Sequence, residues 1–368
     1  MTEFNRAELL KTLDQCRPAI AAVGLIPALS HLWFDGKFVY AYGGGLGIRR
    51  KLECDFQCGL PGKILLDLLK TSALEKVWIN QTEQGVVLQM GKAKINLAQM
   101  PIDEQIWPFP KALPKEAGLP LSEKIFDVFK QLPFVKSSKE TKAVHYGIVV
   151  MVSNTEVGLY ATDSICIAKR AIEVQSTSMP TFIAPWPFVA AVVDLLSGKK
   201  APHLWQLTKY PITNLDFDPN REESDENPKK LLINALIAGV PGTMIASNLL
   251  ELDADPSKIM TKRFTGKLRA LPKGLEPLLQ RATILAGTEE PTLAVSIAKG
   301  VMRLKAKFKT GMIDERIELD GGAPSVNVKI SANLVSAAIK WADKFAISEN
   351  ELLLSGADGF QYMLGTKE

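Results

Sequence analysis

The chain has 368 residues, 46% hydrophobic and 23% charged, which is the usual balance of a soluble protein with buried cores. This length favours two or three domains over one. No apolar run approaches the ~20 residues of a membrane span, and the N-terminus lacks a signal-peptide core, so we expect a cytoplasmic protein without membrane segments. The net charge of +4 is too small for a protein that holds nucleic acid by charge alone, so any such surface requires segregated positive charge.

The cysteines are too few and too scattered for a disulfide framework, and we expect reduced, mostly buried thiols. They are Cys16, Cys54, Cys58 and Cys166. Cys54 and Cys58 could form half of a metal site, but no second Cys/His pair follows at a suitable spacing. The sequence therefore predicts neither a metal nor another cofactor.

A pattern of helices and strands occurs three times along the chain. Each third has two amphipathic helices, in which apolar residues recur at spacings of three and four. Proline near the first turn starts the second helix of the first two thirds, and Ser331 is suited to cap that of the last. The helices are expected at residues 6–17 and 61–72, 122–132 and 185–198, and 275–285 and 331–344.

A pair of strands follows each predicted helix. Aromatic and β-branched residues flank short turns such as Ser153-Asn154, Lys299-Gly300 and Asp358-Gly359, as in β-hairpins. The strand pairs are expected at residues 31–40 and 77–97, 146–160 and 204–237, and 292–308 and 352–364.

Polar and proline-rich segments separate the thirds. Residues 107–121 contain four prolines and several lysines, which predicts a stiff extended linker, and residues 253–274 are also polar. Within the second third, the acidic segment 218–230 predicts a solvated loop. The fold class is therefore α+β, with three repeated domains, each ordered helix, strands, helix, strands. The predicted domains are 1–115, 119–252 and 262–368.

Basic side chains recur on the polar faces of the predicted helices and beside them. A charged helix face is usually only a solvated one. The repeat changes this interpretation, because equivalent helices that face one way would align their cations on one surface. Lysine suits phosphate contacts, which position a protein on nucleic acid without reading its sequence. The candidate cations are Arg6, Lys11, Arg17, Lys63, Lys70, Lys124, Lys130, Lys136, Lys199, Lys200, Lys273, Arg281, Lys340 and Lys344.

Two glycine-rich segments resemble nucleotide loops only superficially. Residues 59–63, Gly-Leu-Pro-Gly-Lys, are too short for a phosphate loop and lack a following Ser or Thr, so a helix start is favoured. Residues 43–47 follow a predicted hairpin strand rather than a strand-to-helix turn and predict a flexible loop.

Catalytic side chains are not grouped in the sequence. His31, His145 and His203 lie in or beside predicted strands with no evident Ser, Cys or Asp partner, so polar structural roles are favoured. Two aspartate pairs could hold a divalent ion as in a nuclease, although their loop settings favour solvation. These pairs are Asp216 with Asp218 and Asp253 with Asp255.

The order and spacing of several segments resemble the bacterial beta sliding clamp family, over essentially the whole chain. In the first third they are residues 6–11, the Leu-Pro-Gly-Lys helix start, and residues 97–110, with Trp-Pro where the family has Phe-Pro. In the second third, Tyr-Ala-Thr-Asp at 160–163 is similar to the family's Val-Ala-Thr-Asp strand. In the last third, residues 280–285 and 329–334 are similar to the two helix signatures.

The resemblance implies a non-enzymatic DNA sliding clamp, a head-to-tail homodimer whose six clamp domains encircle double-stranded DNA. Helices would line the hole and sheets the outside, and topology rather than charge would retain the DNA. By position, Ile284 and Leu285 match a hydrophobic pair at the family's subunit interface. The rival interpretations are a clamp-like protein that captures peptides without encircling DNA, and a metal-dependent nuclease.

The resemblance also implies a pocket that binds short peptides of the replicative polymerase and the clamp loader. This chain has Asp-Ser-Ile-Cys-Ile where the family has Asp-Gly-His-Arg-Leu, and His145 replaces an apolar residue. A final strand ending in Met-Pro-Met-Arg or similar is expected to be missing. We interpret these departures as a shallower, more apolar pocket of a virus- or plasmid-encoded clamp. The pocket residues implied are His145, Thr162, Ser164, Ile165, Cys166, Ile167, Pro241, Met244 and Ile245.

Overall fold

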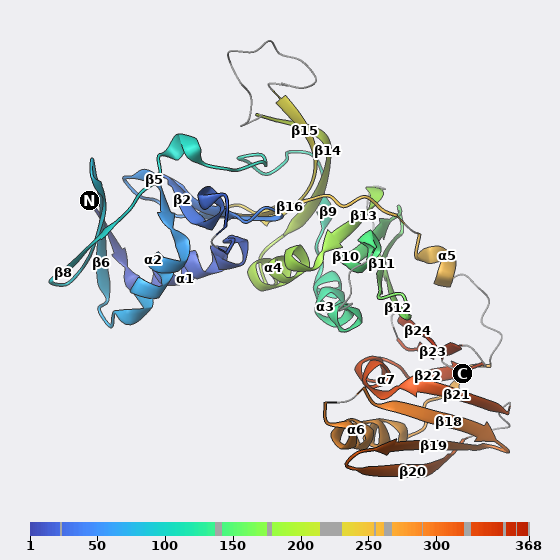
Figure 1. Ribbon diagram of the computed structural model, residues 1–368. Helices are drawn as coiled ribbons and strands as arrows, with labels where there is room; N and C mark the ends of the chain where they lie inside the picture. The colour runs from blue at the N-terminus through green and yellow to red at the C-terminus, as the bar shows by residue number, and fades with distance from the viewer. Residues whose placement is uncertain are drawn as a thin grey trace. The chain divides into compact units, whose positions relative to one another are not determined.

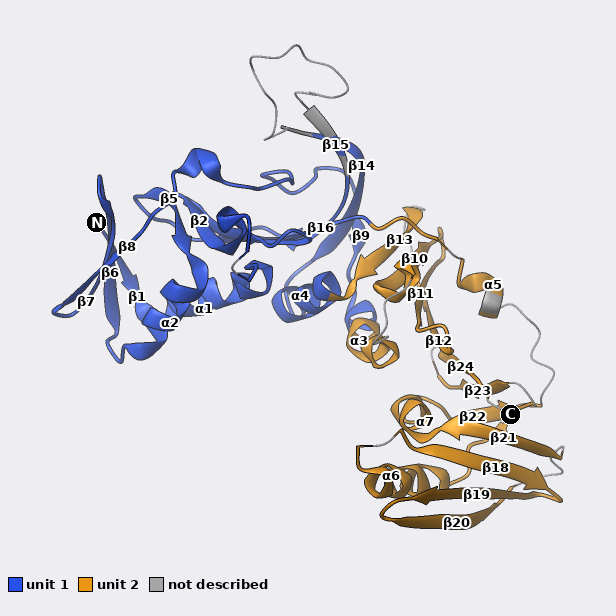
Figure 2. Cartoon of the chain, in the orientation of Figure 1, with its two compact units in different colours: residues 1–126, 187–249 blue, residues 127–186, 250–368 orange. Residues whose placement is uncertain are grey.

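The chain folds into two compact units in a computed structural model (Figure 2). Unit 1 contains residues 1–126 and 187–249, and unit 2 contains residues 127–186 and 250–368. The predicted acidic segment up to residue 229, together with Asp216, Asp218 and Asp358, lies outside the described residues. The structure describes residues 1–22, 24–136, 142–174, 179–213, 230–253, 255–260, 267–288, 290–319, 325–348, 351–357 and 359–366.

All six predicted helices are present (Figure 1). The side chain of Asn5 accepts a hydrogen bond from the Glu8 amide and caps the first helix, and Ser331 caps the last through the Leu334 amide. None of the helices in the described residues combines the length and the apolar content that a membrane span requires. The helices are α1 (Arg6–Cys16), α2 (Gly62–Thr71), α3 (Glu123–Gln131), α4 (Trp186–Leu196), a short α5 (Ser257–Met260), α6 (Leu275–Ala286) and α7 (Ala332–Ile339).

The last helix is shorter than predicted. α7 ends at Ile339, and Lys344 begins a strand instead of closing the helix. The amides of Trp341 and Ala342 still bond to carbonyls three residues back, but the Asp343 amide donates to the Ser355 carbonyl. Pairing with a distant strand therefore ends this helix, which local periodicity does not reveal.

Unit 1 contains an eight-stranded antiparallel sheet in the order β5-β2-β3-β4-β16-β15-β14-β9 and a four-stranded sheet in the order β1-β6-β7-β8. α1 packs on β3 and β4, and α2 on β2 and β5, so both helices cover the same half of the large sheet. Its strands are β1 (Thr2–Asn5), β2 (His31–Asp35), β3 (Phe38–Tyr42), β4 (Leu46–Lys51), β5 (Gln57–Pro61), β6 (Lys76–Thr82), β7 (Gly85–Met90), β8 (Ala93–Leu97), β9 (Leu119–Pro120), β14 (His203–Thr213), β15 (Lys230–Val240) and β16 (Thr243–Asn248).

Unit 2 repeats this plan with an eight-stranded sheet in the order β13-β10-β11-β12-β24-β23-β22-β17 and a four-stranded sheet in the order β20-β19-β18-β21. α6 and α7 pack against each other and against the smaller sheet. Its strands are β10 (Gly147–Val152), β11 (Glu156–Thr162), β12 (Cys166–Glu173), β13 (Met179–Pro185), β17 (Arg269–Ala270), β18 (Thr292–Ala298), β19 (Val301–Phe308), β20 (Gly311–Glu318), β21 (Val326–Ser331), β22 (Lys344–Ile347), β23 (Glu351–Ser355) and β24 (Gln361–Gly365).

The strand order repeats with a period of eight strands. β5-β2-β3-β4, β13-β10-β11-β12 and β21-β18-β19-β20 have the same order, and so do β8-β7-β6-β1, β16-β15-β14-β9 and β24-β23-β22-β17. The fold therefore contains three equivalent groups of eight strands within the described residues, which agrees with the threefold sequence pattern. Each eight-stranded sheet combines strands from two different repeats, so the sheets do not mark where one domain ends and the next begins. The predicted domain limits therefore remain a prediction.

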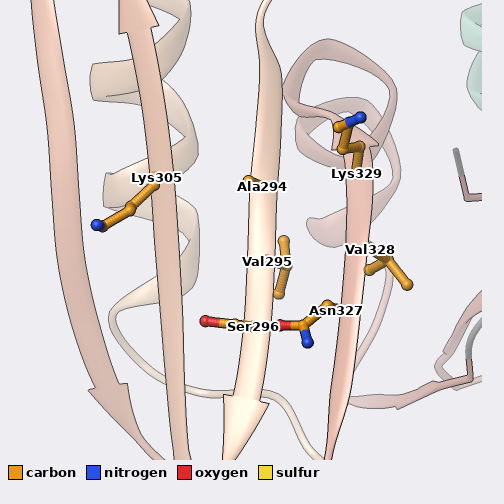
Figure 3. A pocket seen from close by; sticks show the side chains of 7 residues that line it. All are labelled: Ala294, Val295, Ser296, Lys305, Asn327, Val328 and Lys329. Carbon is orange, nitrogen blue, oxygen red and sulfur yellow. The ribbon is translucent and has the colours of Figure 1, made fainter. Parts of the chain in front are cut away.

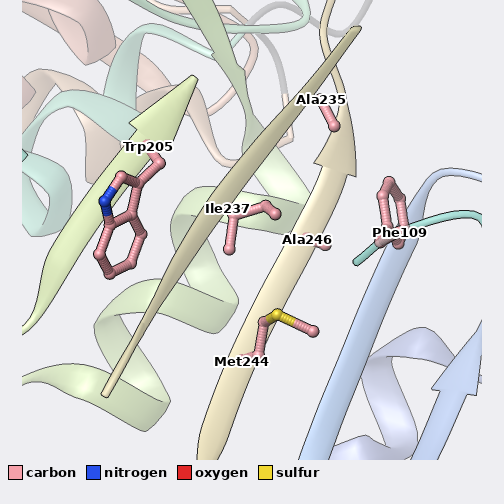
Figure 4. Close-up of a cluster of buried hydrophobic side chains, with 6 residues drawn as sticks. All are labelled: Phe109, Trp205, Ala235, Ile237, Met244 and Ala246. Atoms are coloured by element: carbon pink, nitrogen blue, oxygen red, sulfur yellow. The ribbon is translucent and has the colours of Figure 1, made fainter. Parts of the chain in front are cut away.

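The linker after β8 covers the face of the unit 1 sheet opposite α1 and α2. Trp107 packs edge-on against Tyr40 at 5.3 Å between ring centroids, and Phe109 packs edge-on against Tyr42 at 5.5 Å. Gly47 leaves room for both linker rings, since a Cβ there would lie 2.9 Å from Phe109. A buried cluster continues across β14–β16 and joins the strands of the first and second thirds (Figure 4); its members are Phe109, Trp205, Ala235, Ile237, Met244 and Ala246.

Gly147 offers a direct test of the unit 2 sheet. A Cβ on this residue would overlap the Ala184 carbonyl of the neighbouring strand, so Gly147→Ala must displace β10 from β13. We expect the substitution to lower the free energy of unfolding by about 1–3 kcal/mol, as overpacking does. Gly45→Ala is the matched control, because a Cβ at Gly45 meets nothing within 4 Å. Urea unfolding that fails to separate the two variants would contradict the packing of β10 on β13.

Candidate interfaces for nucleic acid, peptides and a second subunit

The candidate cations of unit 1 differ in their partners. Lys11 on α1 and Lys63 on α2 are exposed and form no ion pair with the described residues, and the same holds for Lys124, Lys199 and Lys200. Arg17 and Lys70 lie 3.7 and 3.8 Å from the Asp14 carboxylate. Exposed pairs of this kind contribute little to stability and exchange readily for other anions.

Arg6 has a structural role that the sequence did not reveal. Its Nε donates to the Leu74 carbonyl at 2.8 Å, and its Nη1 donates to the Leu69 carbonyl at 3.2 Å. These carbonyls lie at and after the C-terminal end of α2, where backbone acceptors lack helical partners. Arg6 therefore holds α1 to the end of α2 and is a poor candidate for nucleic-acid contact.

The candidate cations of unit 2 are also mixed. Arg281 makes a two-pronged ion pair with Glu315, at 2.9 and 2.5 Å, and Lys130 lies 3.7 Å from Asp127. Lys340 lies 5.2 Å from the centre of the Trp341 ring. The remaining three are exposed and have no ion pair with the described residues: Lys136 beyond α3, Lys273 before α6, and Lys344 at the start of β22.

An apolar cluster lies on one face of the eight-stranded sheet of unit 2. Val149 pairs with both Tyr160 and Ile183, and Ile167 pairs with Met363, so these side chains point the same way. Val144 completes the buried set. Partly exposed apolar side chains extend the cluster toward solvent: Ala143, Met151, Leu250 and Met260. Of the predicted pocket residues, Ile167 belongs to this cluster.

Four more predicted pocket residues of unit 2 lie in or beside the turn between β11 and β12: Thr162, Ser164, Ile165 and Cys166. The Asp163 carboxylate accepts from the amides of Ile165 and Cys166, and Thr162 Oγ1 accepts from the Ser164 amide. Cys166 is buried, which raises the pKa of its thiol, whereas Ile165 is 52% exposed. The turn is therefore ordered by its own side chains and presents one apolar residue to solvent.

His145 has a serine partner that the sequence did not reveal. Its Nε2 lies 2.8 Å from Ser164 Oγ, although only 2% of the residue is exposed. Its carbonyl accepts from the Trp186 indole, and the preceding amides donate to the Asp253 carboxylate. The contact between His145 and Ser164 therefore links the 3₁₀ turn before β10 to the turn after β11.

The predicted pocket residues of unit 1 lie around the turn between β15 and β16. Pro241 is exposed, whereas Ile245 is fully buried. Met244 is buried in the cluster with Phe109 and Trp205. In unit 1, only Pro241 of these three is thus available at the surface.

The expected loss of the final strand is wrong. β24 forms at Gln361–Gly365 and pairs with β12 on one side and β23 on the other. The Gly365 amide also donates to the Ile165 carbonyl at 2.9 Å. Met363 on this strand supplies an apolar side chain to the cluster. The sequence did not reveal the strand because pairing with β12 and β23, rather than a recognisable motif, defines it.

Two large apolar side chains are exposed on unit 2 beside β20. Ile284 on α6 is 77% exposed, and Met312 on β20 is 69% exposed. Leu285 lies against the start of β20, because a Cβ on Gly311 would be 3.3 Å from Leu285 Cδ2. The Leu285 carbonyl also accepts a hydrogen bond from the Thr310 hydroxyl. Both side chains are therefore candidates for burial against a partner, although a single exposed apolar residue is normal on a protein surface.

Catalytic and metal chemistry gain no support from the described residues. These residues contain no group of three or more His, Cys, Asp or Glu side chains that could hold a metal. Asp253 caps a 3₁₀ turn, and Ser257 binds Asp255 and lowers the pKa of its carboxyl group. All four cysteines are free, and burial raises the pKa of Cys16 and Cys58 to about 12.

A hollow of about 200 Å³ lies on the sheet of β18, β19 and β21, with Lys305 and Lys329 on its two sides (Figure 3). Sites for small molecules are usually ~300–1,000 Å³. This hollow is therefore too small to define a substrate site.

Solved structures of bacterial DNA polymerase III beta subunits are similar in fold to this chain. The match to the DNA polymerase III beta subunit of Pseudomonas aeruginosa covers 100% of this chain and 99% of that chain. Its TM-score is 0.80, at 15% sequence identity. A putative beta subunit of Eubacterium rectale gives 0.81 at 15% identity, and the Caulobacter crescentus pol III beta gives 0.79 at 16%, each with 100% of this chain and 99% of theirs. The fold is therefore the clamp fold of these beta subunits.

The sequence itself resembles beta sliding clamps over a shorter stretch. It is 26% identical over 121 residues to the beta sliding clamps of Staphylococcus epidermidis and Staphylococcus aureus. The chain spans about a third of the length of these relatives, 32%, and the match covers 32% of this chain. No family model matches the sequence. The resemblance predicted from sequence motifs is confirmed, with the divergence that the motifs indicated.

Proposed function

We propose that the chain is a DNA sliding clamp, which as a head-to-tail homodimer encircles duplex DNA and tethers the replicative polymerase and clamp loader. It catalyses no reaction in this proposal. The observation that carries it is the threefold strand repeat. Two strand pairings join neighbouring repeats within the chain. The two strands that would make the third equivalent pairing are not paired with each other among the described residues, and we call them the open junction.

The open junction consists of β20 and β8. β4 pairs antiparallel with β16, and β12 pairs antiparallel with β24. By the period of eight strands, β20 is equivalent to β4 and β12, and β8 is equivalent to β16 and β24. Each of these two strands is the edge of a four-stranded sheet. Exposed edges invite pairing with another chain, and a head-to-tail contact of this kind closes into a ring when the rotation permits.

The side chains at the two edges favour a mutual contact. The turn before β8 presents the exposed Lys92, and β8 itself presents the exposed Lys94 and the partly exposed Ile95. β20 carries three acidic residues and one basic residue, Asp314, Glu315, Glu318 and Arg316, so its net charge is negative. Asp314 pairs with Arg303 and Lys305, which lower the pKa of its carboxyl group to about 2, and Glu315 pairs with Arg281. Glu318 is the acidic residue of β20 without an ion pair among the described residues. Ile284 and Met312 add apolar surface beside β20.

DNA contact in the proposal rests on lysines of the helices and their flanks. The exposed Lys11, Lys63, Lys124, Lys199 and Lys200 of unit 1 carry flexible point charges without fixed partners among the described residues. Such contacts bind phosphates without reading bases and permit sliding. A closed ring needs no large net charge, which agrees with +4 for the whole chain.

Retention on circular DNA tests the proposal against its two rivals. We expect the assembled protein, loaded on nicked circular plasmid, to remain bound through gel filtration and to be released when the plasmid is linearised. Equal loss from both forms would favour a peptide-capture protein that does not encircle DNA. Plasmid cleavage that requires Mg²⁺ or Mn²⁺ and disappears in Asp253→Asn/Asp255→Asn would favour the nuclease.

A further inference from the structure

Three equivalent sheet faces in this fold differ in what covers them. By the period of eight strands, β5, β13 and β21 are equivalent, and a helix follows each of them directly. One residue on each strand lies three positions before that helix and pairs with the neighbouring strand. The equivalent pairs are Gly59 with Trp33, Ile183 with Val149, and Lys329 with Ala294. The three faces can therefore be compared at the same position.

In the first two repeats, an extended segment of the chain covers this face. Gly59 and Met100 exchange two backbone hydrogen bonds of 2.9 Å, and Leu250 bridges Ile183 in the same antiparallel sense. Met100 and Leu250 also pack against the apolar clusters of their sheets. In unit 1 the segment continues across the sheet to the Tyr40 ring of β3. The fold therefore takes up an extended chain at this position in two of its repeats.

The equivalent face of the third repeat is exposed. Ala294 pairs with Lys305 on one side and with Lys329 on the other, and all three residues are exposed. Because Ala294 stands where the first repeat has Trp33, the hollow of about 200 Å³ remains between the two lysines (Figure 3). β21 is the edge of its sheet in the described part of the chain. This face is therefore open to a segment of another chain.

Positive charge predominates on this face. Arg303 and Lys305 share the Asp314 carboxylate, whereas Lys307 and Arg316 are exposed and form no ion pair with the described residues. Side chains alternate along a strand, so these residues point to the same side of the sheet as the hollow. The charged residues of this face are Arg303, Lys305, Lys307, Arg316, Lys329, Asp314 and Glu318. Carboxylates of a partner would complement this excess of cations.

We propose that an acidic segment of a partner protein docks here as an extended chain, which enters at the edge of β21 and crosses the hollow toward β19. A polypeptide is favoured over a nucleic acid, because the four strands contain a single aromatic residue, Phe308, which is buried. Bases would therefore find no ring to stack on. Ser296 and Asn327 pair across the hollow and supply hydroxyl and amide groups that suit a peptide backbone. The proposal is independent of ring closure and of DNA contact.

Selection from a displayed library of random decapeptides tests the proposal on the full-length protein. The library would first be depleted on Ala294→Trp, which fills the hollow with the side chain found at the equivalent Trp33. We expect the peptides that then bind the wild type to be enriched in Asp and Glu. In calorimetry, the most enriched peptide should bind Lys305→Glu about 2- to 10-fold more weakly, because an exposed charge pair is lost and repulsion replaces it.

Lys37→Glu is the matched control, since it makes the same charge change on the exposed turn between β2 and β3 of unit 1. It should bind the peptide as tightly as the wild type, and circular dichroism establishes that each variant folds. A library with no enriched sequence, an enriched set without acidic residues, or unchanged binding to Lys305→Glu would overturn the proposal. Binding of oligothymidine that Lys305→Glu weakens, without acidic peptides, would make the face a nucleic-acid surface instead. A lower solution mass of Ala294→Trp would overturn it in favour of a second copy of this chain.

Discussion

Ile284→Asp combined with Leu285→Asp should convert the assembled ring into single chains. Ile284 is 77% exposed within one chain, so burial between subunits is the reason to expect an apolar residue there. Two aspartates at a buried contact would lack partners, and an unpaired buried charge costs ~3–5 kcal/mol. That cost corresponds to a loss of affinity between subunits of roughly a hundredfold or more.

Light scattering checks this expectation through the solution mass of the variant. Leu232→Asp is the control, because Leu232 is 64% exposed but lies on β15, which is not part of the open junction. The control should keep the wild-type mass. An Ile284/Leu285 variant with an unchanged mass would refute the interface assignment, while circular dichroism establishes that the variant still folds.

Replacing Lys199 and Lys200 by alanine should weaken retention on DNA and its dependence on salt. Both side chains are exposed just beyond α4, so no folded contact among the described residues is lost. Each phosphate contact removed lowers the slope of log affinity against log salt by about 0.9, so two contacts lower it by about 2. Assembly should be unaffected, since neither residue lies on β8 or β20.

The salt dependence of retention on a nicked plasmid, measured by gel filtration, checks this prediction. Lys111→Ala/Lys115→Ala removes the same charge from the linker on the opposite side of the unit 1 sheet, and it should leave the slope unchanged. Identical slopes for the two variants would mean that charge acts only through the net value and not through a surface around α4.

The helices could be predicted from sequence because each has a local signal. The apolar spacing of α1 and α6 and the caps at Asn5 and Ser331 act within a few residues. The strands were undercounted, since one predicted pair after each first helix is four strands in the structure. β20 carries four charged residues among eight, and its pairing with the preceding strand β19 defines it. β9 and β17 have two residues each, so their distant partners β14 and β22 define them.

The candidate interfaces were less predictable, because long-range contacts set their chemistry. The link between His145 and Ser164 joins residues 19 positions apart, and the use of Arg6 depends on carbonyls 63 and 68 positions away. Exposure also separated residues that the resemblance grouped together, such as the exposed Pro241 and the buried Ile245. Unusual residue choices, such as serine for glycine at position 164, were the only local signals of these roles.

Solution mass measured by light scattering over a range of protein concentrations tests the closed ring most directly. The chain has a mass of 40.3 kDa, and the pairing of β20 with β8 predicts a stable species of twice that mass. A mass of one chain at every concentration would contradict ring closure by this protein alone.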